Sequence, residues 1–181
     1  MANLNTFVQR LAGGGARANQ YEVSITGGPI ATTDLFTFLC RSAQIPSQTI
    51  GEVPVPYRGR NIYVAGERVF DPWTVTVFSD AAWSIRGQLE QWSNLIQNMG
   101  STTTGATSPE QYYGEGMVRQ MDRNEGTINT YRLYQIWPQV VDPIDLAYDA
   151  NDVVEEFGIT WRYNYMTSSG GGGTVQAGEF S

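Results

Sequence analysis

Strict alternation of apolar and polar residues over short segments is the feature that most constrains how this chain can fold. Between residues 157 and 165 every second residue is aromatic or isoleucine, and the residues between them are small or polar. Segments 21–26 and 73–78 repeat this two-residue period, which is typical of strands with one buried face. Further strands are expected over residues 35–41, 116–121 and 127–139. The chain is therefore predicted to be mainly β, as a sandwich or barrel of two packed antiparallel sheets.

The period lengthens between residues 80 and 99, where apolar residues recur every three or four positions. This apolar stripe consists of Ile85, Leu89, Trp92, Ile96 and Met99. Such spacing predicts one long outer α-helix with a single apolar face. Asp80 is expected to cap its N-terminus, and Gly100 is expected to end it. A shorter helix is expected over residues 4–11.

A hairpin with few residues suited to a core is expected between residues 48 and 64. Its two β-prone segments flank the turn Pro56-Tyr57-Arg58-Gly59. Pro54 and Pro56 cannot donate hydrogen bonds to a neighbouring strand, so they belong at an edge or beyond a sheet. The hairpin is therefore predicted to protrude from the body, and an element of this kind often exists to contact a neighbour.

Apolar and basic side chains of this hairpin are the candidate contact residues. They are Val53, Val55, Tyr57, Arg58, Arg60, Ile62 and Arg68. The three arginines form a local basic patch, which suits a protein neighbour of acidic character, and that neighbour could be another copy of this chain. A nucleic-acid interface is a weaker interpretation, because the chain as a whole is acidic.

Composition excludes most catalytic classes. The chain has 18 acidic and 11 basic residues, a formal net charge of −7, and every basic residue is arginine. Without histidine there is no Ser-His-Asp triad and no Cys-His dyad. Without lysine there is no Walker A loop and no Schiff-base chemistry. A carboxylate-based enzyme remains formally open, but no motif singles out a pair of carboxylates, so we expect no enzyme and no catalytic residue.

Metal and cofactor sites are also not expected. The single cysteine, Cys40, excludes a disulfide within one chain and a zinc site of the usual kind, and it is expected to be a buried structural thiol. The acidic residues between 142 and 156 do not follow the ligand spacing of a calcium loop, so a solvated acidic face is the preferred interpretation.

One domain is expected over residues 1–166, followed by a flexible Gly/Ser-rich tail over residues 167–181. No apolar run is long enough to span a bilayer, so no membrane anchor is expected. The N-terminus lacks the basic start and apolar core of a signal peptide, which indicates intracellular synthesis.

One segment resembles a known family. Residues 64–77, Val-Ala-Gly-Glu-Arg-Val-Phe-Asp-Pro-Trp-Thr-Val-Thr-Val, closely resemble a segment of the tail tube proteins of T-even-type contractile-tailed bacteriophages. Residues 14–23, 38–46, 117–120 and 136–138 agree with that family in order and approximate spacing. The resemblance covers about residues 1–166 and leaves out the Gly-rich tail.

The resemblance implies a structural role. Members of that family form hexameric rings, which stack into a helical, hollow tube inside a contractile sheath, and double-stranded DNA passes through the tube into the host without specific binding. The implied partners are further copies of the chain, the sheath protein, and the baseplate, tape-measure and tail terminator proteins. The implied location is the virion tail, after synthesis in the bacterial host cytoplasm.

Three expectations follow for the residues of this chain. The hairpin would reach the adjacent ring. The outer helix would face the sheath, with Arg86, Glu90 and Asn94 as candidate contacts. Acidic groups that faced the lumen would repel DNA phosphates.

Two other interpretations stay open at the level of sequence. The first is the inner tube of a related contractile injection system, either pyocin-like or cell-puncturing, which would have the same fold and a different cargo. The second is a baseplate or lectin-like binding module, which would cap or taper an assembly instead of polymerising.

Overall fold

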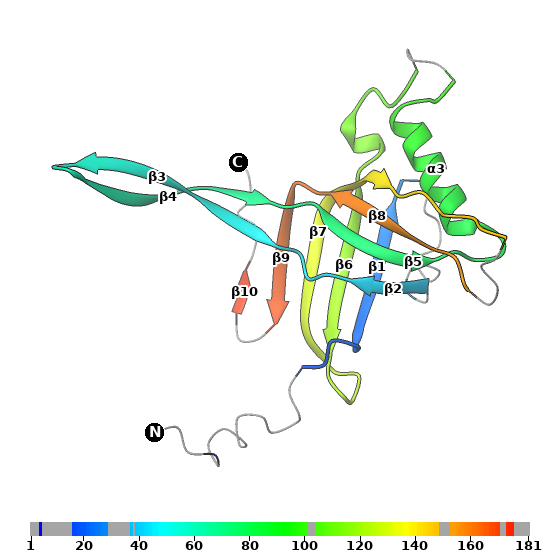
Figure 1. Cartoon of the computed structure of the whole chain (residues 1–181), viewed down its shortest axis with the longest axis horizontal. Coiled ribbons are helices and arrows are strands. Elements are labelled where there is room, and N and C mark those ends of the chain that lie inside the picture. Colours follow the sequence, from blue (N-terminus) through cyan, green and yellow to red (C-terminus); the bar gives the residue numbers. More distant parts are fainter. Residues whose placement is uncertain are drawn as a thin grey trace.

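The computed structural model describes residue 4 and residues 16–28, 37, 39–100, 104–148, 153–170 and 173–175. Its strands are β1 (Tyr21–Gly27), β2 (Cys40–Ala43), β3 (Gln48–Tyr57), β4 (Arg60–Phe70), β5 (Trp73–Phe78), β6 (Gly114–Met121), β7 (Thr127–Val141), β8 (Glu156–Arg162), β9 (Tyr165–Gly170) and β10 (Gly173–Val175). The long helix is α3 (Ser84–Ile96), and a short 3-10 helix, η1, covers Pro109–Gln111. The chain is therefore mainly β, as the alternating segments predict (Figure 1).

Two antiparallel sheets form the body and share one strand. The first joins β1, β6, the start of β7, β9 and β10. The second joins the end of β7 to β8, β5 and β2. The strands β3 and β4 pair only with each other in the described structure, and they project from the body as a long twisted arm (Figure 1). The predicted sandwich with a protruding hairpin is confirmed, and the pairing of these strands does not close into a barrel.

Strand β7 passes from one sheet to the other at Gln135. This residue has a φ of 57°, which is uncommon for a residue with a side chain, and the register between β6 and β7 shifts there. On the facing side, Asn164 donates through its side-chain nitrogen to Oε1 of Gln135 at 2.7 Å and through its backbone N–H to the carbonyl of Tyr134 at 3.2 Å. The predicted single strand over 157–165 is therefore wrong, because it breaks at this corner into β8 and β9.

The core lies between the two sheets and under α3. Its fully buried large side chains include Trp73, Trp92, Trp161, Ile25, Ile85, Leu89, Leu133, Ile136 and Ile159. The indole rings of Trp92, from the helix, and Trp161, from β8, meet edge to face with centroids 5.5 Å apart. The alternating residues of β5 and β8 that the sequence assigns to a buried face are thus the ones that fill the sandwich.

Helix α3 is shorter than the predicted range of 80–99. Asp80 accepts hydrogen bonds from the backbone N–H groups of Ser84 at 2.9 Å and Ile85 at 3.5 Å, so it caps a helix that begins four residues after it. Burial opposes ionisation of this carboxyl group, but the hydrogen bonds outweigh it and lower its pKa. At the other end Gln97 is already extended, so Gly100 does not end the helix, and Met99, 77% exposed, lies outside the buried stripe.

The strand predicted over 35–41 is confirmed at Cys40 and Arg41 and wrong at Thr37 and Leu39, and its other positions lie outside the described residues. Thr37 and Leu39 are helical, and β2 begins only at Cys40. Cys40 is half-buried instead of fully buried, and burial raises the pKa of its thiol to about 11, which keeps it protonated near neutral pH. The helix predicted over 4–11 lies outside the described residues except for Leu4.

Strand pairing continues beyond residue 166, where the sequence predicts the domain to end. Strand β9 extends to Gly170 and pairs with β7 along its whole length. Strand β10 then pairs with β9 through Gly173–Val175. Residues 167–170 and 173–175 thus add strand pairing to the first sheet, whereas the composition of this stretch indicates a flexible tail.

Replacing Gly114 with alanine should destabilise the fold by about 1–3 kcal/mol, because the added methyl group would overpack the core. A Cβ there would lie 2.5 Å from the carbonyl oxygen of Thr26 and 2.8 Å from the Trp92 ring. The control is Gly87→Ala in α3, where a Cβ meets nothing within 4 Å and should stabilise the helix by up to about 1 kcal/mol. Urea unfolding followed by tryptophan fluorescence measures both. Equal stability of the Gly114 variant and the unmodified protein would contradict the close packing.

Candidate assembly surface

The arm made by β3 and β4 ends in a tight turn. Tyr57 pairs with Arg60, and the two residues between them, Arg58 and Gly59, have φ angles of 46° and 81°. Two successive positive φ values are those of the type I′ turn, whose twist matches that of a two-stranded hairpin. The guanidinium of Arg58 lies over the Tyr57 ring, 5.4 Å from its centroid. The arm therefore has a defined tip with a cation stacked on an aromatic ring.

One face of the arm is a continuous apolar surface. Because residues paired across antiparallel strands share a face, Val53 with Val64 and Val55 with Ile62 form neighbouring cross-strand pairs on the same side. Tyr57 with Arg60 completes this row at the tip. We call these six residues the apolar face of the hairpin. All ten residues of β3 are exposed, so the body of the same chain does not cover this face.

The structure places five of the seven predicted contact residues on one face of the arm and the other two outside that face. Val53, Val55, Tyr57, Arg60 and Ile62 all belong to the apolar face. Arg58 lies in the turn next to them. Arg68 pairs with Ile50 on the other side of a register shift, closer to the body than the tip. Their role in contacting a neighbour stays a prediction.

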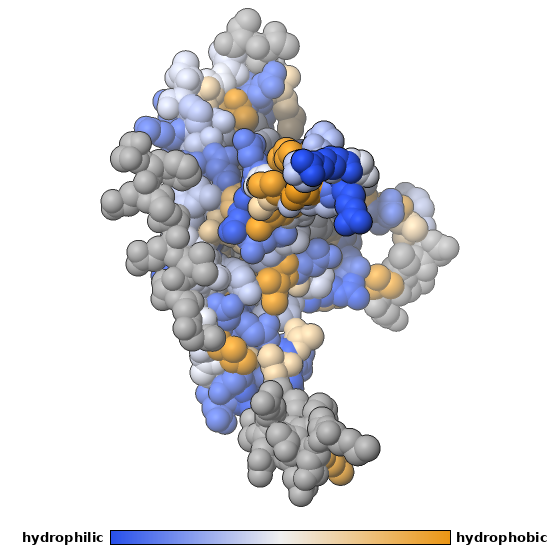
Figure 2. Space-filling model, turned by 90° about the vertical axis from the view of Figure 1, so that its left-hand side faces the viewer, coloured by the Kyte–Doolittle hydropathy of each residue, from blue (hydrophilic) through white to orange (hydrophobic). Residues whose placement is uncertain are grey.

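Positive charge is concentrated at the tip. Between residues 53 and 64 the sequence contains Arg58 and Arg60 and no acidic residue. Figure 2 looks onto the arm end-on and shows hydrophobic side chains beside strongly hydrophilic ones at its tip. An uncovered apolar surface with a cationic border is typical of a protein–protein contact site.

The predicted sheath-facing residues of α3 differ in their surroundings. Arg86 lies against the body, where it donates to the carbonyl of Asp142 at 2.6 Å and lies 5.2 Å above the Phe157 ring. It also pairs with Glu90 through Nε and Oε1 at 3.1 Å. Glu90 is exposed, and Asn94 is half-exposed and accepts from the backbone N–H of Met99. Of the three, Glu90 is the side chain most available to a partner.

A second uncovered surface lies in the segment that connects β7 to β8, and the sequence analysis did not predict it. Residues 143–148 and 153–156 line a cavity of about 670 Å³. We call it the acidic pocket, because Asp145, Glu155 and Glu156 lie among its lining residues. The missed signal is the set of apolar residues between these acids: Leu146, Tyr148, Val153 and Val154 are all exposed large side chains.

No group of three or more Cys, Asp or Glu residues is placed to hold a metal ion in the part of the chain that the structure describes. No described helix is long and apolar enough to cross a membrane.

Comparison with known proteins assigns the family. Residues 16–168 match the model of a family described as phage tail tube protein. This chain belongs to the phage tail tube protein family. The family resemblance of residues 64–77, which include most of β4 and much of β5, is thereby confirmed. The match extends over nearly the whole described body.

Named relatives of this tail tube family chain come from phages. The tail tube protein gp19 of Enterobacteria phage T4 is 32% identical over 151 residues, which cover 83% of this chain and 90% of that protein. The tail tube protein of Serratia phage KSP90 is 25% identical over 169 residues, which cover 90% of this chain and 95% of the relative.

Solved structures of more distant proteins share the fold. A chain of the anti-feeding prophage baseplate aligns with a TM-score of 0.66 at 14% identity, over 86% of this tail tube family chain and 96% of its own length. A chain of the sheath–tube complex of an extracellular contractile injection system aligns with a TM-score of 0.60 at 12% identity, over 90% and 97% of the two chains.

Proposed function

We propose that this chain is the structural subunit of the inner tube of a contractile phage tail and has no enzymatic role. The observation that carries the proposal is the apolar face of the hairpin, which its own fold leaves uncovered. An isolated two-stranded hairpin is at best marginally stable in water, so an arm of this length is best explained by a partner that covers it. In a stack of rings that partner is a neighbouring subunit of the same kind.

Ring formation would also cover an open sheet edge. In the described structure β1 pairs on one side only, with β6. Exposed strand edges invite uncontrolled pairing, and closure around a ring removes them. If each of six subunits contributed the four strands β1, β6, β7 and β9, the ring would contain about 24 strands and have a diameter on the order of 45–50 Å. Such a ring leaves room for a DNA duplex.

The polar face of that sheet fits a wall that does not hold DNA. Its charged residues include Glu22, Glu115, Arg119 and Arg132, which lie on the side opposite the buried Val23, Val118 and Leu133. Glu22 and Arg119 pair at 2.7 Å. These two carboxylates and two guanidinium groups cancel formally. If this face lines the lumen, DNA passes a polar and nearly neutral wall, and the acidic lumen considered from the sequence is not needed.

The remaining partners belong to the same proposal. The exposed Glu90 and half-exposed Asn94 of α3 would contact the sheath. Baseplate, tape-measure and terminator proteins would meet the ends or the lumen of the tube. The chain would be made in the host cytoplasm and would act in the virion tail. The alternative is the inner tube of a related contractile injection system. Genes for a capsid and a portal protein beside the gene of this chain would favour a phage tail over this alternative.

Electron microscopy of the purified protein tests the proposal. The expected result is hexameric rings that stack into hollow tubes, and these tubes should retain no DNA on a filter at low ionic strength. Monomers at every concentration, or rings that taper and do not stack, would overturn the proposed role. Retention of DNA on the filter would contradict only the proposed neutral lumen wall and would leave the proposed tube role standing.

A further inference from the structure

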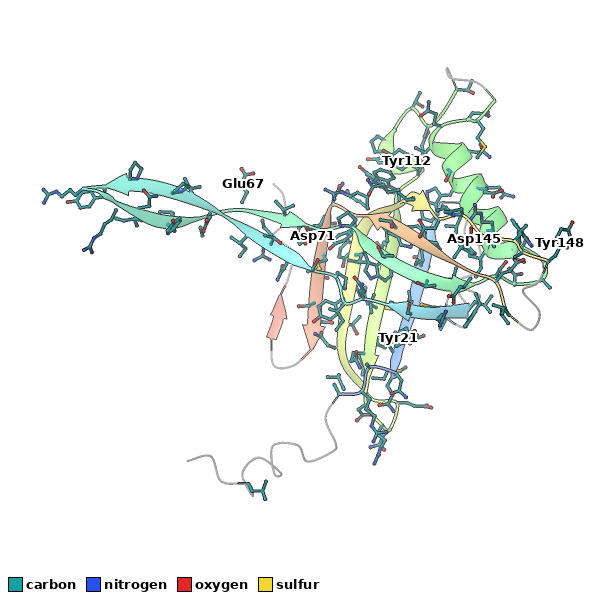
Figure 3. All side chains as sticks on the ribbon, in the orientation of Figure 1. Tyr21, Glu67, Asp71, Tyr112, Asp145 and Tyr148 are labelled. Carbon is teal, nitrogen blue, oxygen red and sulfur yellow. The ribbon has the colours of Figure 1, made fainter. Side chains whose placement is uncertain are left out.

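The acidic pocket and the hairpin tip lie at opposite ends of the molecule. Figure 3 labels two pocket residues, Asp145 and Tyr148, on the far side of the body from the arm. We propose that the acidic pocket receives the hairpin tip of another copy of this chain. The proposal rests on the proposed tube function and deepens it by naming the surface that the arm meets.

The pocket offers apolar surface that the described part of its own chain leaves exposed. Leu146 and Val153 are 76% and 71% exposed, and Tyr148 is fully exposed. Exposed apolar patches on a protein of this size mark interaction sites. A cavity of about 670 Å³ is in the range that accepts one small ligand, so it suits a few side chains of a narrow element such as a hairpin end.

The charges of the two surfaces are complementary. The tip carries Arg58 and Arg60 without an acid between residues 53 and 64. The lining residues of the pocket include Asp145, Glu155 and Glu156 and no basic residue. Glu156 already pairs with Arg41, but no described cation lies within ion-pair distance of Asp145. Complementary charge of this kind fixes which surfaces meet and in which orientation.

Two backbone hydrogen bonds fix the ends of the pocket-lining stretch. The backbone N–H of Asp142 donates to the carbonyl of Gly158, in β8, at 2.9 Å. The backbone N–H of Ser79, directly after β5, donates to the carbonyl of Glu155 at 2.8 Å. These bonds lower the ordering cost of binding at the two ends.

The positions of the two surfaces favour stacking over closed pairing. A tip on one end that binds a pocket on the other end makes a head-to-tail contact between different surfaces. Repetition of such a contact gives an open-ended array unless rotation closes it. The arm, with ten residues in β3 at about 3.4 Å each, is long enough to leave its own ring and enter the next.

A charge swap tests the contact. The variants are R58E with R60E at the tip, D145R with E155R in the pocket, and the combination of all four. Each pair alone should raise the protein concentration needed for tube formation by about tenfold or more, because like charges then face each other. The combination of all four substitutions should return this concentration to within about threefold of the value for the unmodified protein. A pocket variant that assembles normally, or a combination that restores nothing, would overturn the proposal.

A cysteine pair separates this contact from tube formation as such. In a Cys40→Ala background, Y57C with L146C should give cross-linked chains of increasing length under mild oxidation. The control pair is Y57C with V140C, which places the second thiol at an exposed position of β7 outside the pocket. This pair should not give cross-linked chains. Tubes that form without the cross-link would show that the tip does not bind the pocket and would still support the tube function. A cross-link between chains that form no tubes would support the contact and contradict the tube function.

Discussion

Substituting asparagine for both Val55 and Ile62 should abolish tube formation by the purified protein and leave its body folded. The two side chains form a cross-strand pair on the apolar face and are 44% and 52% exposed in the single chain. Against a neighbour they would be buried, and each unpaired amide there would cost about 1–3 kcal/mol beyond the lost apolar contact. Every subunit carries the change, so the loss recurs at each contact. Sedimentation and electron microscopy measure the assembled fraction.

The opposite side of the hairpin supplies the matched control. Pro54 and Tyr63 form the adjacent cross-strand pair on the other face, and asparagine at both positions adds the same two amides. This variant should assemble at a concentration within a few-fold of that for the unmodified protein. Equal loss in both variants would show that a partner surrounds the arm, and normal assembly of both would remove the hairpin from the contact. Far-ultraviolet circular dichroism confirms that each body is folded.

The hairpin could be predicted from the sequence because the signal there is local. Two prolines, a turn ending in glycine and a lack of large core residues all point to a strand pair outside the body. The turn residues Arg58 and Gly59 fix the register, and the register then decides which residues share a face. The shared face of Val53, Val55 and Ile62 follows from residue spacing and this register.

The corner of the sandwich could not be predicted, because it depends on contacts between distant strands. The alternating pattern runs without interruption through residues 157–165, yet the chain changes sheets there. The cause lies in β7, where Gln135 adopts a positive φ and binds Asn164 through its side chain. A glutamine in the middle of a strand carries no local signal for such a bend. Long-range pairing therefore overrides the local period.

The acidic pocket could not be predicted from the sequence for a different reason. The spacing of its acids fits no calcium loop, and acidic residues on their own indicate a solvated face. Leu146 and Val153 have no alternating or helical partner pattern, so they do not predict a core. Their exposure becomes informative only when the fold shows that no described element packs over them. Exposed apolar residues in an acidic loop indicate a binding surface, and hydrophobic periodicity does not detect them.

Replacing Trp92 with alanine should lower the free energy of unfolding by about 3–5 kcal/mol. The indole is fully buried, meets Trp161 edge to face at 5.5 Å, and donates from Nε1 to the carbonyl of Tyr112 at 2.7 Å. Truncation therefore leaves both a cavity between α3 and the sheets and an acceptor without its donor. A loss of this size should move the urea unfolding midpoint by at least about 1 M, given slopes of about 1–3 kcal/mol/M.

The control is Trp83→Ala, at the residue just before α3, where the side chain is 47% exposed. The same truncation there should change stability by about 0.5 kcal/mol or less, because little packed surface is lost. If both variants lost the same free energy, the Trp92 site would not be the close-packed centre that the fold shows. A large loss at Trp92, with the hairpin variants still fully folded, would establish that the core stabilises the body and that the arm is free to serve a neighbour.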